Sequence, residues 1–596
     1  MIRRPLRPLA RVLSARLKGE NPDDVEAEER AARLRKLQKV ERQRAETRLL
    51  LVGVLFLMGF GAVGGRMAML AASEPVEPTS GGQRATITMQ RADIVDRNGN
   101  ILATNLATEA LYAQPLEMVD PQAAATGLAE IFPDLDAEKL LADFTGTKKF
   151  LWLKRTISPE QHQAVHDLGE PGLLFGPREI RLYPNGKIAA HVLGGAGFGR
   201  EGVHAAEVIG KAGVESKFDD YLRDPAEGGA PLELSLDLSV QSAVETVLAG
   251  GMRLMNAKGA SAVLMDVKTG EILSLASLPD FDPNQRPVAP TKGDPADSPI
   301  FNRVVQGRYE LGSTFKIFTA AMALESGYAN PNTMIDTQGP LRWGKFTIRD
   351  FHDYGKTLSL MDVIVKSSNI GTARMAQEMG TEKQQAFLKS LGFFEALPVE
   401  LTEASRSKPL LPPRWSELST MTISYGHGLA ASPLHLATAY SSIVNGGVRV
   451  TPTILKREAP RAGADFVISE ATSSEVTRML RAVVSRGTAS MGDVPGYSVG
   501  GKTGTADKPH PNGGYYEDKV ITTFAATFPT NEPKYVLVVT LDEPEIEDGD
   551  EARRTAGWTA APVAAEIIRR IAPLMNMRPE NMEQESQVVS MALARN

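Results

Sequence analysis

The chain contains no cysteine, which excludes disulfide bonds, thiol nucleophiles and thiolate metal ligands. Its charges nearly balance, with a net charge of −6 at pH 7, so the composition gives no sign of a nucleic acid partner. The His-Glu-x-x-His pattern of zinc enzymes is also missing. His162 and His166 have a possible metal spacing, but no third ligand accompanies them. We therefore expect neither a metal site nor a cofactor.

Long apolar runs are scarce as well, because only Leu49 to Ala72 could cross a bilayer. Its one charged residue, Arg66, can reach the interface with its long side chain. Residues 1–48 carry the basic excess, which predicts a cytoplasmic N-terminus with the rest of the chain outside. That basic region is too long for a signal peptide, so the sequence predicts a single retained transmembrane helix.

Beyond this span, a polar linker at 73–88 leads to Arg91–Ala103, where apolar residues flank Asn98-Gly99 and predict a β-hairpin. The following turn-rich segments form no catalytic set, and they predict a structural pedestal. We predict a cytoplasmic tail at 1–48, a transmembrane helix at 49–72 and a linker with the pedestal at 73–230. A catalytic domain follows at 231–576, and a disordered tail at 577–596.

The catalytic region mixes strand and helix patterns, which predicts an α+β domain. The predicted strands are Leu234–Asp237, Ala260–Met265, Ile272–Leu278, Val499–Thr505, Ile521–Phe528 and Tyr535–Leu541, the second and third forming a hairpin. The predicted helices include Ser239–Ala249 (ending at Gly250-Gly251), Ser313–Glu325, Met421–Asn445, Glu475–Val484 and a closing helix Pro562–Ile571.

The stretch Gly312-Ser313-Thr314-Phe315-Lys316 opens one of these helices, and Gly327 is its expected stop. Ser313 would lie in the first turn, where free N–H groups and the positive dipole end favour developing negative charge. Lys316, three residues on, would share its face. A serine needs a base to become a good nucleophile, and a lysine can be that base only if burial or a nearby cation lowers its pKa.

Two further motifs follow in order: Ser367-Ser368-Asn369 at a predicted turn beside a helix, and Lys502-Thr503-Gly504-Thr505 on a predicted strand. Together the three motifs resemble the set found in penicillin-binding proteins and serine β-lactamases. With Arg91–Ala103 and Ser424-Tyr425-Gly426-His427-Gly428, the resemblance to class B penicillin-binding proteins covers roughly residues 89 to 571.

Within that class the chain is most similar to the division-specific septal transpeptidase, because elongation relatives tend to carry Ser-Cys-Asp where this chain has Ser367-Ser368-Asn369. Leu311 and His435 stand where many relatives have proline and glutamine, and these departures weaken the subtype more than the activity.

The resemblance implies an antiparallel sheet flanked by helices, of the penicillin-binding/serine β-lactamase type, on an elongated pedestal. It implies a peptidoglycan D,D-transpeptidase that acts on stem peptides ending in D-Ala-D-Ala. Ser313 would be the nucleophile, Lys316 the base, Ser367 the proton relay, and Asn369 a holder of Lys316 and the substrate amide. The N–H groups of Ser313 and Thr505 would form the oxyanion hole, and the substrate would bind along Lys502, Thr503, Gly504 and Thr505. The residues alone leave open which lysine is the base.

The implied partners are lipid-linked peptidoglycan precursor, nascent glycan strands, β-lactams and other division proteins. Residues 89–230 lack the Glu-Asp-x-x-Phe-x-x-His-x-Gly pattern, so a membrane glycosyltransferase would make the glycan. The implied location is the bacterial inner membrane, with a periplasmic catalytic domain. Three alternatives remain open: an elongation-type transpeptidase, a secreted β-lactamase, and a non-catalytic β-lactam-binding scaffold or sensor. A secreted β-lactamase would be about half as long.

The span gives the first testable prediction. Because the basic excess precedes Leu49, reporters fused after residue 80 should be active only if they work outside the cytoplasm. Paired periplasmic and cytoplasmic reporters measure this, and activity of the cytoplasmic reporter at that site would reverse the topology.

Overall fold

The computed structural model describes residues 51–64, 91–201, 206–224, 229–457, 459, 465–510, 513–548 and 551–580, with scattered positions between 11 and 36. The chain divides into two units, residues 1–86 and 87–596. In the first unit, residues 51–64 are helical, and the rest of the predicted span Leu49–Ala72 lies outside the described residues. Among the described helices, none combines the length and hydropathy needed to cross a membrane. The predicted linker 73–88 and the end of the tail also lie outside the described residues.

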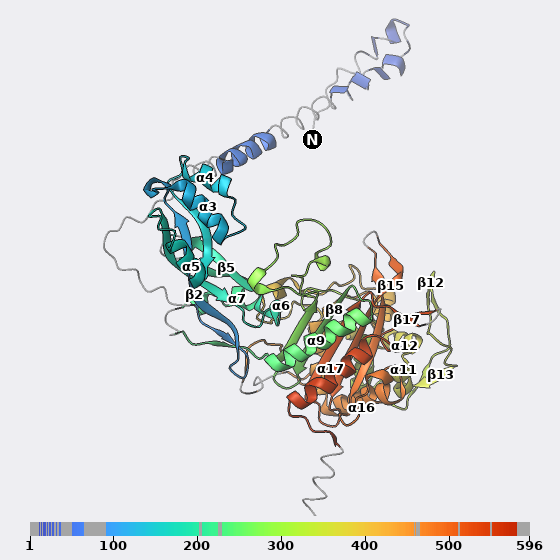
Figure 1. Cartoon of the computed structure of the whole chain (residues 1–596). Coiled ribbons are helices and arrows are strands. Elements are labelled where there is room, and N and C mark those ends of the chain that lie inside the picture. Colours follow the sequence, from blue (N-terminus) through green and yellow to red (C-terminus); the bar gives the residue numbers. More distant parts are fainter. Residues whose placement is uncertain are drawn as a thin grey trace, which may run out of the picture. The chain divides into compact units, whose positions relative to one another are not determined.

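The second unit begins with the hairpin that Asn98-Gly99 predicts. β1 (Ile94–Val95) pairs antiparallel with β2 (Ile101–Ala113), and Gly99 takes a φ of +84° in the turn between them. The long strand β2 also pairs with two further strands, β3 (Leu151–Ile157) and β4 (Leu173–Leu182). Three helices cover a small separate core beside this sheet (Figure 1): α3 (Pro121–Ile131), α4 (Ala137–Phe144) and α5 (Pro159–His166).

A buried network of charged side chains joins the start of the second unit to the rest of the pedestal. The remaining elements of the pedestal are α6 (Ala190–Leu193), β5 (Gly195–Glu201), β6 (Ala206–Ala212), α7 (Gly213–Lys217) and α8 (Asp219–Arg223). Glu215 is fully buried and accepts hydrogen bonds of 2.7 Å from Arg91 and from Arg181. The Tyr183 hydroxyl lies 3.2 Å from the same carboxylate, and Arg91 also pairs with Asp219 at 2.7 Å. Strand, loop and helix are therefore fixed around one buried charge.

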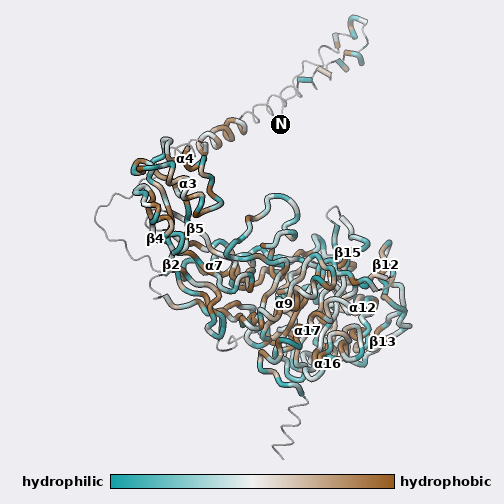
Figure 2. Tube along the Cα trace, viewed as in Figure 1, coloured by the Kyte–Doolittle hydropathy of each residue, from teal (hydrophilic) through white to brown (hydrophobic). Residues whose placement is uncertain are grey.

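The C-terminal part is built on a five-stranded antiparallel sheet in the order β14-β15-β16-β8-β9 (Figure 1). These strands are β14 (Gly500–Pro509), β15 (Tyr515–Phe528), β16 (Tyr535–Asp542), β8 (Gly259–Asp266) and β9 (Ile272–Leu278). Every residue of β9 is buried, so both faces of the sheet are covered. Two long helices, α9 (Leu238–Leu254) and α17 (Ala560–Leu574), pack together on the sheet, and Figure 2 shows apolar residues concentrated along them. The predicted α+β architecture is thus confirmed.

Further helices surround this sheet. They are α10 (Lys316–Glu325), α11 (Leu360–Lys366), α12 (Asn369–Met379), α13 (Thr381–Ser390), α14 (Glu417–Ile423), α15 (Pro433–Val444) and α16 (Glu470–Arg486). Short strand pairs lie outside it: β10 (Met334–Asp336) with β13 (Thr357–Ser359), β11 (Leu341–Trp343) with β12 (Phe346–Ile348), and β17 (Ile546–Asp548) with β18 (Glu551–Arg553). Helix α15 packs against β8 and β16, and α16 runs beside the edge strand β14.

Predicted bounds are wrong for three helices and one strand. The helix predicted at Glu475–Val484 is α16, which begins at Glu470. Helix α9 continues through Gly250-Gly251 to Leu254, where it packs against α17. Gly251 serves that packing and not a helix stop, since a Cβ there would lie 2.7 Å from Val563. Met421–Asn445 is two helices, since Gly426 in the loop between α14 and α15 adopts a φ of +91°. The strand expected at Leu234–Asp237 lies instead at β7 (Leu232–Glu233), which pairs parallel with β1.

The Glu215 network gives a stability prediction. Replacing Glu215 with alanine leaves Arg91 and Arg181 buried without their shared carboxylate, which should destabilise the folded chain by about 3–5 kcal/mol. Denaturant unfolding of the detergent-solubilised protein measures this loss. Glu179, on the same pedestal but outside the network, is a suitable control position. A stability loss at Glu215 no larger than at the control would contradict the prediction.

Candidate active site

The predicted nucleophile lies in a 3₁₀ turn and not in the first turn of an α-helix. Residues Gly312–Phe315 form this turn, and α10 begins at Lys316. The Thr314 hydroxyl donates to the Leu311 carbonyl at 2.8 Å, so the side chain reinforces the tight turn. With about three residues per turn, Ser313 and Lys316 lie on the same side. Ser313 is partly exposed while its neighbours in the turn are buried, so the turn presents Ser313 to the site. The expected stop is in place, because α10 ends at Glu325 and Gly327 has a φ of +69°.

Three glycines let three chain segments meet at this turn. Gly312, at a φ of +55°, has its Cα so close to β14 that a Cβ would lie 2.7 Å from the Thr505 carbonyl oxygen. A Cβ on Gly504 would lie 2.3 Å from the Leu311 carbonyl, and one on Gly426 would lie 1.9 Å from the Gly312 carbonyl. No larger residue fits at these positions without backbone movement. The backbone of Thr505 therefore lies directly beside the nucleophile turn.

Two buried lysines converge on one serine hydroxyl. Lys316 and Lys502 are both fully buried, and each donates to Ser367 Oγ at 3.0 Å. Lys316 also donates to the Ser367 carbonyl at 2.5 Å, and Lys502 to the Thr503 carbonyl at 3.1 Å. Ser367 has a φ of +65° at the end of α11, a conformation uncommon for residues other than glycine. Within the described residues neither lysine has an acidic partner in salt-bridge range.

The surroundings favour neutral amines. Burial, followed by the charge of Lys502, holds the pKa of Lys316 well below its ordinary value, and Asp350 only partly opposes this. Burial alone lowers the pKa of Lys502 to about 7. Desolvation penalises the ammonium form, and a second cation nearby penalises it further. A lysine held in this way can accept a proton from a serine near neutral pH.

Asn369 and Asp350 complete the second motif. The Asn369 amide donates to the Arg349 carbonyl at 2.9 Å, and the described residues show no hydrogen bond from it to Lys316. Asp350 accepts from the Ser368 hydroxyl at 2.6 Å and from the Asn369 and Ile370 N–H groups at 2.5 and 3.0 Å. It thereby fixes the start of α12. Sequence reasoning missed Asp350, because a single acidic residue in a loop carries no signal of the helix that it will cap.

The remaining third-motif residues lie along the edge strand. Thr503 bonds through its hydroxyl to that of Thr488 at 2.8 Å, and Thr505 Oγ1 accepts from the Ala556 N–H at 3.0 Å. Strand β14 is at the end of the sheet, so one side of its backbone has no partner among the described strands. An extended peptide could add to that side by backbone hydrogen bonds.

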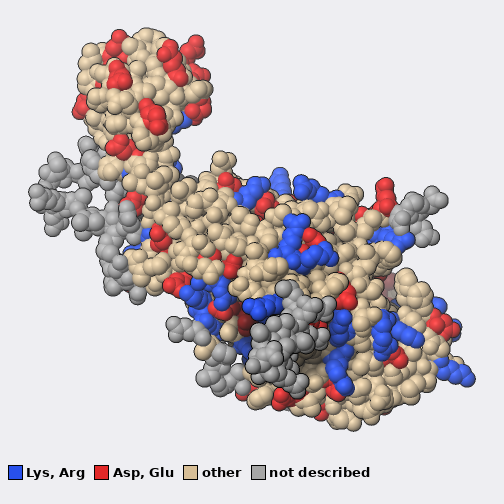
Figure 3. Space-filling model, turned by 60° about the horizontal axis from the view of Figure 1, so that its bottom comes forward, with Lys and Arg blue, Asp and Glu red and all other residues tan. Residues whose placement is uncertain are grey.

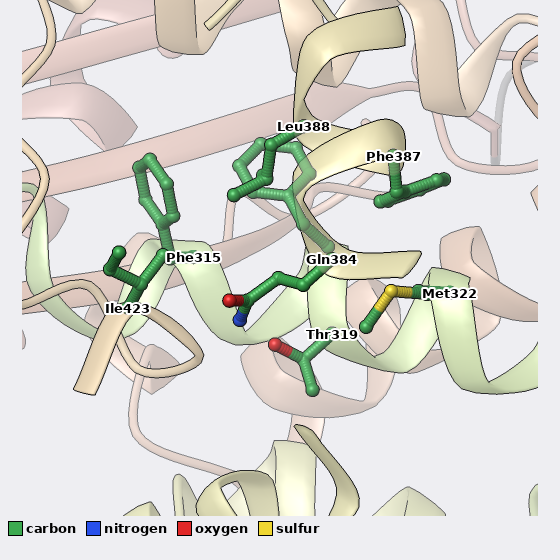
Figure 4. A pocket seen from close by; sticks show the side chains of 8 residues that line it. Phe315, Thr319, Met322, Gln384, Phe387, Leu388 and Ile423 are labelled. Carbon is green, nitrogen blue, oxygen red and sulfur yellow. The ribbon is translucent and has the colours of Figure 1, made fainter. Parts of the chain in front are cut away.

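The far side of the nucleophile helix is packed against α13 and the end of α14. Figure 4 shows a small cavity there, between Phe315 of the 3₁₀ turn, Thr319 and Met322 of α10, and side chains of the other two elements, Gln384, Phe387, Leu388 and Ile423. The Thr319 hydroxyl donates to the Ser424 carbonyl at 2.9 Å, and the Gln384 amide donates to the Thr420 carbonyl at 2.9 Å. The first of these bonds ties α10 to the end of α14, and the second ties α13 to α14 behind it, so the support of α10 lies on the side away from β14.

Charge on the surface is mixed. Figure 3 shows basic and acidic side chains interspersed over the larger lobe on the face that it displays. This face therefore carries no extended field of one sign.

The turn that exposes Ser313, the two buried lysines and the adjoining edge strand are the arrangement expected of a serine acyl-transfer enzyme. Family comparison agrees. Residues 260–569 match the penicillin-binding protein transpeptidase domain, and residues 86–229 match the penicillin-binding protein dimerisation domain. The chain belongs to the penicillin-binding proteins, which confirms the resemblance seen in the motifs.

Individual relatives support this assignment. The chain is 37% identical to a probable peptidoglycan D,D-transpeptidase FtsI of Caulobacter vibrioides, over 84% of this chain and 83% of the relative. It is 27% identical to the peptidoglycan D,D-transpeptidase FtsI of Escherichia coli, over 89% and 91% of the two chains. A crystal structure of penicillin-binding protein 3 of Mycobacterium tuberculosis with aztreonam is similar, with a TM-score of 0.62, 27% identity and coverage of 82% and 97%.

The two lysines give a pair of kinetic predictions. Lys316→Ala should slow acylation of Ser313 by about 10²- to 10⁴-fold, as expected for loss of a general base. Stopped-flow acylation by a chromogenic β-lactam at saturating concentration measures the step. A loss of binding with an unchanged chemical step would contradict this role.

A pH profile separates the two lysines. Protonation of Lys316 at low pH should stop catalysis, and the charge of Lys502 helps to hold the pKa of Lys316 down. In Lys502→Gln that charge is gone, so the pKa of Lys316 should rise and the acidic limb of the acylation rate should move to higher pH. An acidic limb that stays in place or moves to lower pH would contradict this coupling.

Proposed function

We propose that this protein is a peptidoglycan D,D-transpeptidase that cross-links stem peptides through an acyl-enzyme on Ser313. The observation that carries the proposal is the convergence of Lys316 and Lys502 on Ser367 beside the turn that presents Ser313. The names of the FtsI relatives from Caulobacter vibrioides and Escherichia coli support the same reaction.

The first half of the reaction transfers an acyl group to the protein. Ser313 Oγ attacks the carbonyl carbon of the penultimate D-Ala, and neutral Lys316 takes the hydroxyl proton. The N–H groups of Ser313 and Thr505 would stabilise the oxyanion, each such donor lowering the barrier by roughly 3 kcal/mol. The proton passes through Ser367 to the departing nitrogen, the peptide bond breaks, and the terminal D-Ala leaves with both hydrogens on its amine. Lys502, Thr503 and Thr505 would bind the terminal carboxylate.

The second half releases the acyl group to an acceptor. The amine of a neighbouring stem peptide attacks the ester carbonyl and loses a proton to the same relay. The relay then returns a proton to Ser313 Oγ as that oxygen leaves. A new peptide bond forms and the ester bond breaks. A β-lactam would acylate Ser313 in the same way and remain attached. The aztreonam and ampicillin complexes of the similar penicillin-binding protein 3 structures fit this expectation.

The setting of this activity is part of the proposal. The FtsI relatives favour septal synthesis over the elongation-type alternative. Leu49–Ala72 would anchor the chain in the bacterial inner membrane, with the pedestal at 73–230 and the catalytic domain at 231–576 in the periplasm. A membrane glycosyltransferase and other division proteins would act with it. Ser313, Lys316 and Lys502 are all present, which favours an enzyme over a non-catalytic scaffold or sensor.

Covalent labelling tests the nucleophile. Wild-type protein incubated with a fluorescent penicillin should gain one stable adduct on the peptide containing Ser313, and Ser313→Ala should gain none because the attacking oxygen is absent. Intact-protein mass spectrometry with peptide mapping measures both. Labelling of folded Ser313→Ala at the wild-type rate would refute the assignment, and rapid loss of the wild-type adduct would favour a β-lactamase.

A further inference from the structure

Glu310, three residues before Ser313, is a meeting point of three chain segments. Its side chain is only 11% exposed, although it carries a carboxylate. One oxygen accepts from the Gly428 N–H at 2.9 Å, and the other lies 3.1 Å from Nδ1 of His427. The Tyr515 hydroxyl donates to the same carboxylate, at 3.0 and 3.1 Å from its two oxygens. None of these side chains belongs to the three motifs.

The ionised form of Glu310 is favoured at this place. Burial opposes ionisation, but the hydrogen bonds from His427, Gly428 and Tyr515 outweigh it and lower the pKa of Glu310. Burial and the same carboxylate raise the pKa of Tyr515, which therefore stays a donor. Hydrogen bonds to an ionised carboxylate are about twice as strong as those between neutral groups.

The segment that carries Tyr515 is the outer end of the β14–β15 hairpin. The strands pair as far as Asp507 with Val520, and after an irregularity Pro509 pairs with Tyr515. Near its base, salt bridges fix the hairpin: Lys508 to Asp542 at 2.6 Å and to Glu543 at 2.8 Å, and Lys519 to Glu543 at 2.9 Å.

At the outer end, Tyr515 is half exposed, so apolar burial contributes little there. Its ring lies 6.4 Å from that of His427, centre to centre. The hydroxyl bond to Glu310 is thus the main described link between the hairpin end and the nucleophile segment.

We propose that Glu310 is a positioning residue that holds the β14–β15 hairpin against the nucleophile segment through Tyr515. Strand β14 carries Thr505 and continues directly into this hairpin, so the link fixes the strand edge along which the acyl donor would lie. Because Glu310 also holds the His427-Gly428 loop, one carboxylate sets the loop and the hairpin relative to Ser313. This inference rests on the proposed acyl transfer, although Glu310 takes no part in the bond changes.

Two substitutions break the link at opposite ends, and a third is a matched control. Tyr515→Phe removes only the hydroxyl of a half-exposed side chain, so the fold should be retained. Glu310→Gln removes the charge at constant size. Tyr516→Phe removes a neighbouring hydroxyl whose ring faces His510 and Lys519 and has no described contact with Glu310.

The second-order rate constant for acylation of the full chain by a chromogenic β-lactam should fall about three- to tenfold in Tyr515→Phe, the scale of one hydrogen bond. Glu310→Gln should lose at least as much, and Tyr516→Phe should match wild type. Since both changes break one link, the double variant should be no slower than Glu310→Gln. Hydrogen exchange at residues 516–520 should accelerate in Tyr515→Phe but not in Tyr516→Phe.

The outcomes separate this inference from the proposed function. Wild-type acylation is measured first, and its absence would overturn the acyl-transfer proposal itself. If wild type is acylated but Tyr515→Phe equals it in rate and exchange, the positioning role is wrong. Effects of Tyr515→Phe and Glu310→Gln that multiply in the double variant would also refute a shared link. Should Glu310→Gln fail to fold, the comparison of Tyr515→Phe with Tyr516→Phe still decides.

Discussion

The active site depends on one constraint: two buried lysine amines hydrogen-bond to the same serine hydroxyl. Lys316 and Lys502 are fully buried and meet at Ser367 Oγ. Two ammonium groups so close together in a desolvated site would repel strongly, so the arrangement is stable only when at least one amine is neutral. The electrostatic cost of burial is thus the reason that a lysine can act as a base. A surface lysine with the same sequence spacing could not.

Several local features exist because of this convergence. Ser367 adopts a left-handed backbone conformation, which lets its carbonyl and its hydroxyl both face Lys316. Asp350 caps the next helix and holds that turn in place. On the other side, Gly312, Gly426 and Gly504 remove side chains where the nucleophile turn, the loop after α14 and β14 touch. Strain and glycine are concentrated where three elements must meet within a few ångströms.

The sequence predicts the parts of this site that depend on local pattern. The hairpin at Asn98-Gly99, the β8–β9 hairpin and the chemistry of the three motifs follow from residue type and spacing. The sequence does not predict features set by distant neighbours. Helix α9 passes through Gly250-Gly251 because α17 packs against it, and the break before Pro433 depends on contact with Gly312. Glu310 was missed for the same reason, since its partner Tyr515 lies 205 residues away.

The junction between the two family domains explains why the pedestal is more than a tether. The match to the dimerisation domain ends at residue 229 and the match to the transpeptidase domain begins at residue 260, which suggests a linker between the two domains. In the structure that interval is β7 and α9, and both are bonded to the pedestal. Asp96, in the hairpin turn, accepts from the Leu238 N–H at 3.0 Å and so helps to cap α9.

The same turn is also bonded to the segment before α9, since the Arg97 N–H donates to the Leu236 carbonyl at 2.9 Å. A second connection runs from the Gly213 N–H to Glu403 at 3.1 Å, and from the Thr402 hydroxyl back to the Gly213 carbonyl. Because α9 also packs on β8 and β9, the pedestal is continuous with the frame of the catalytic sheet. The pedestal is therefore bonded to the elements that support the sheet of Lys502 and Thr505, and it is not joined to them by the chain alone.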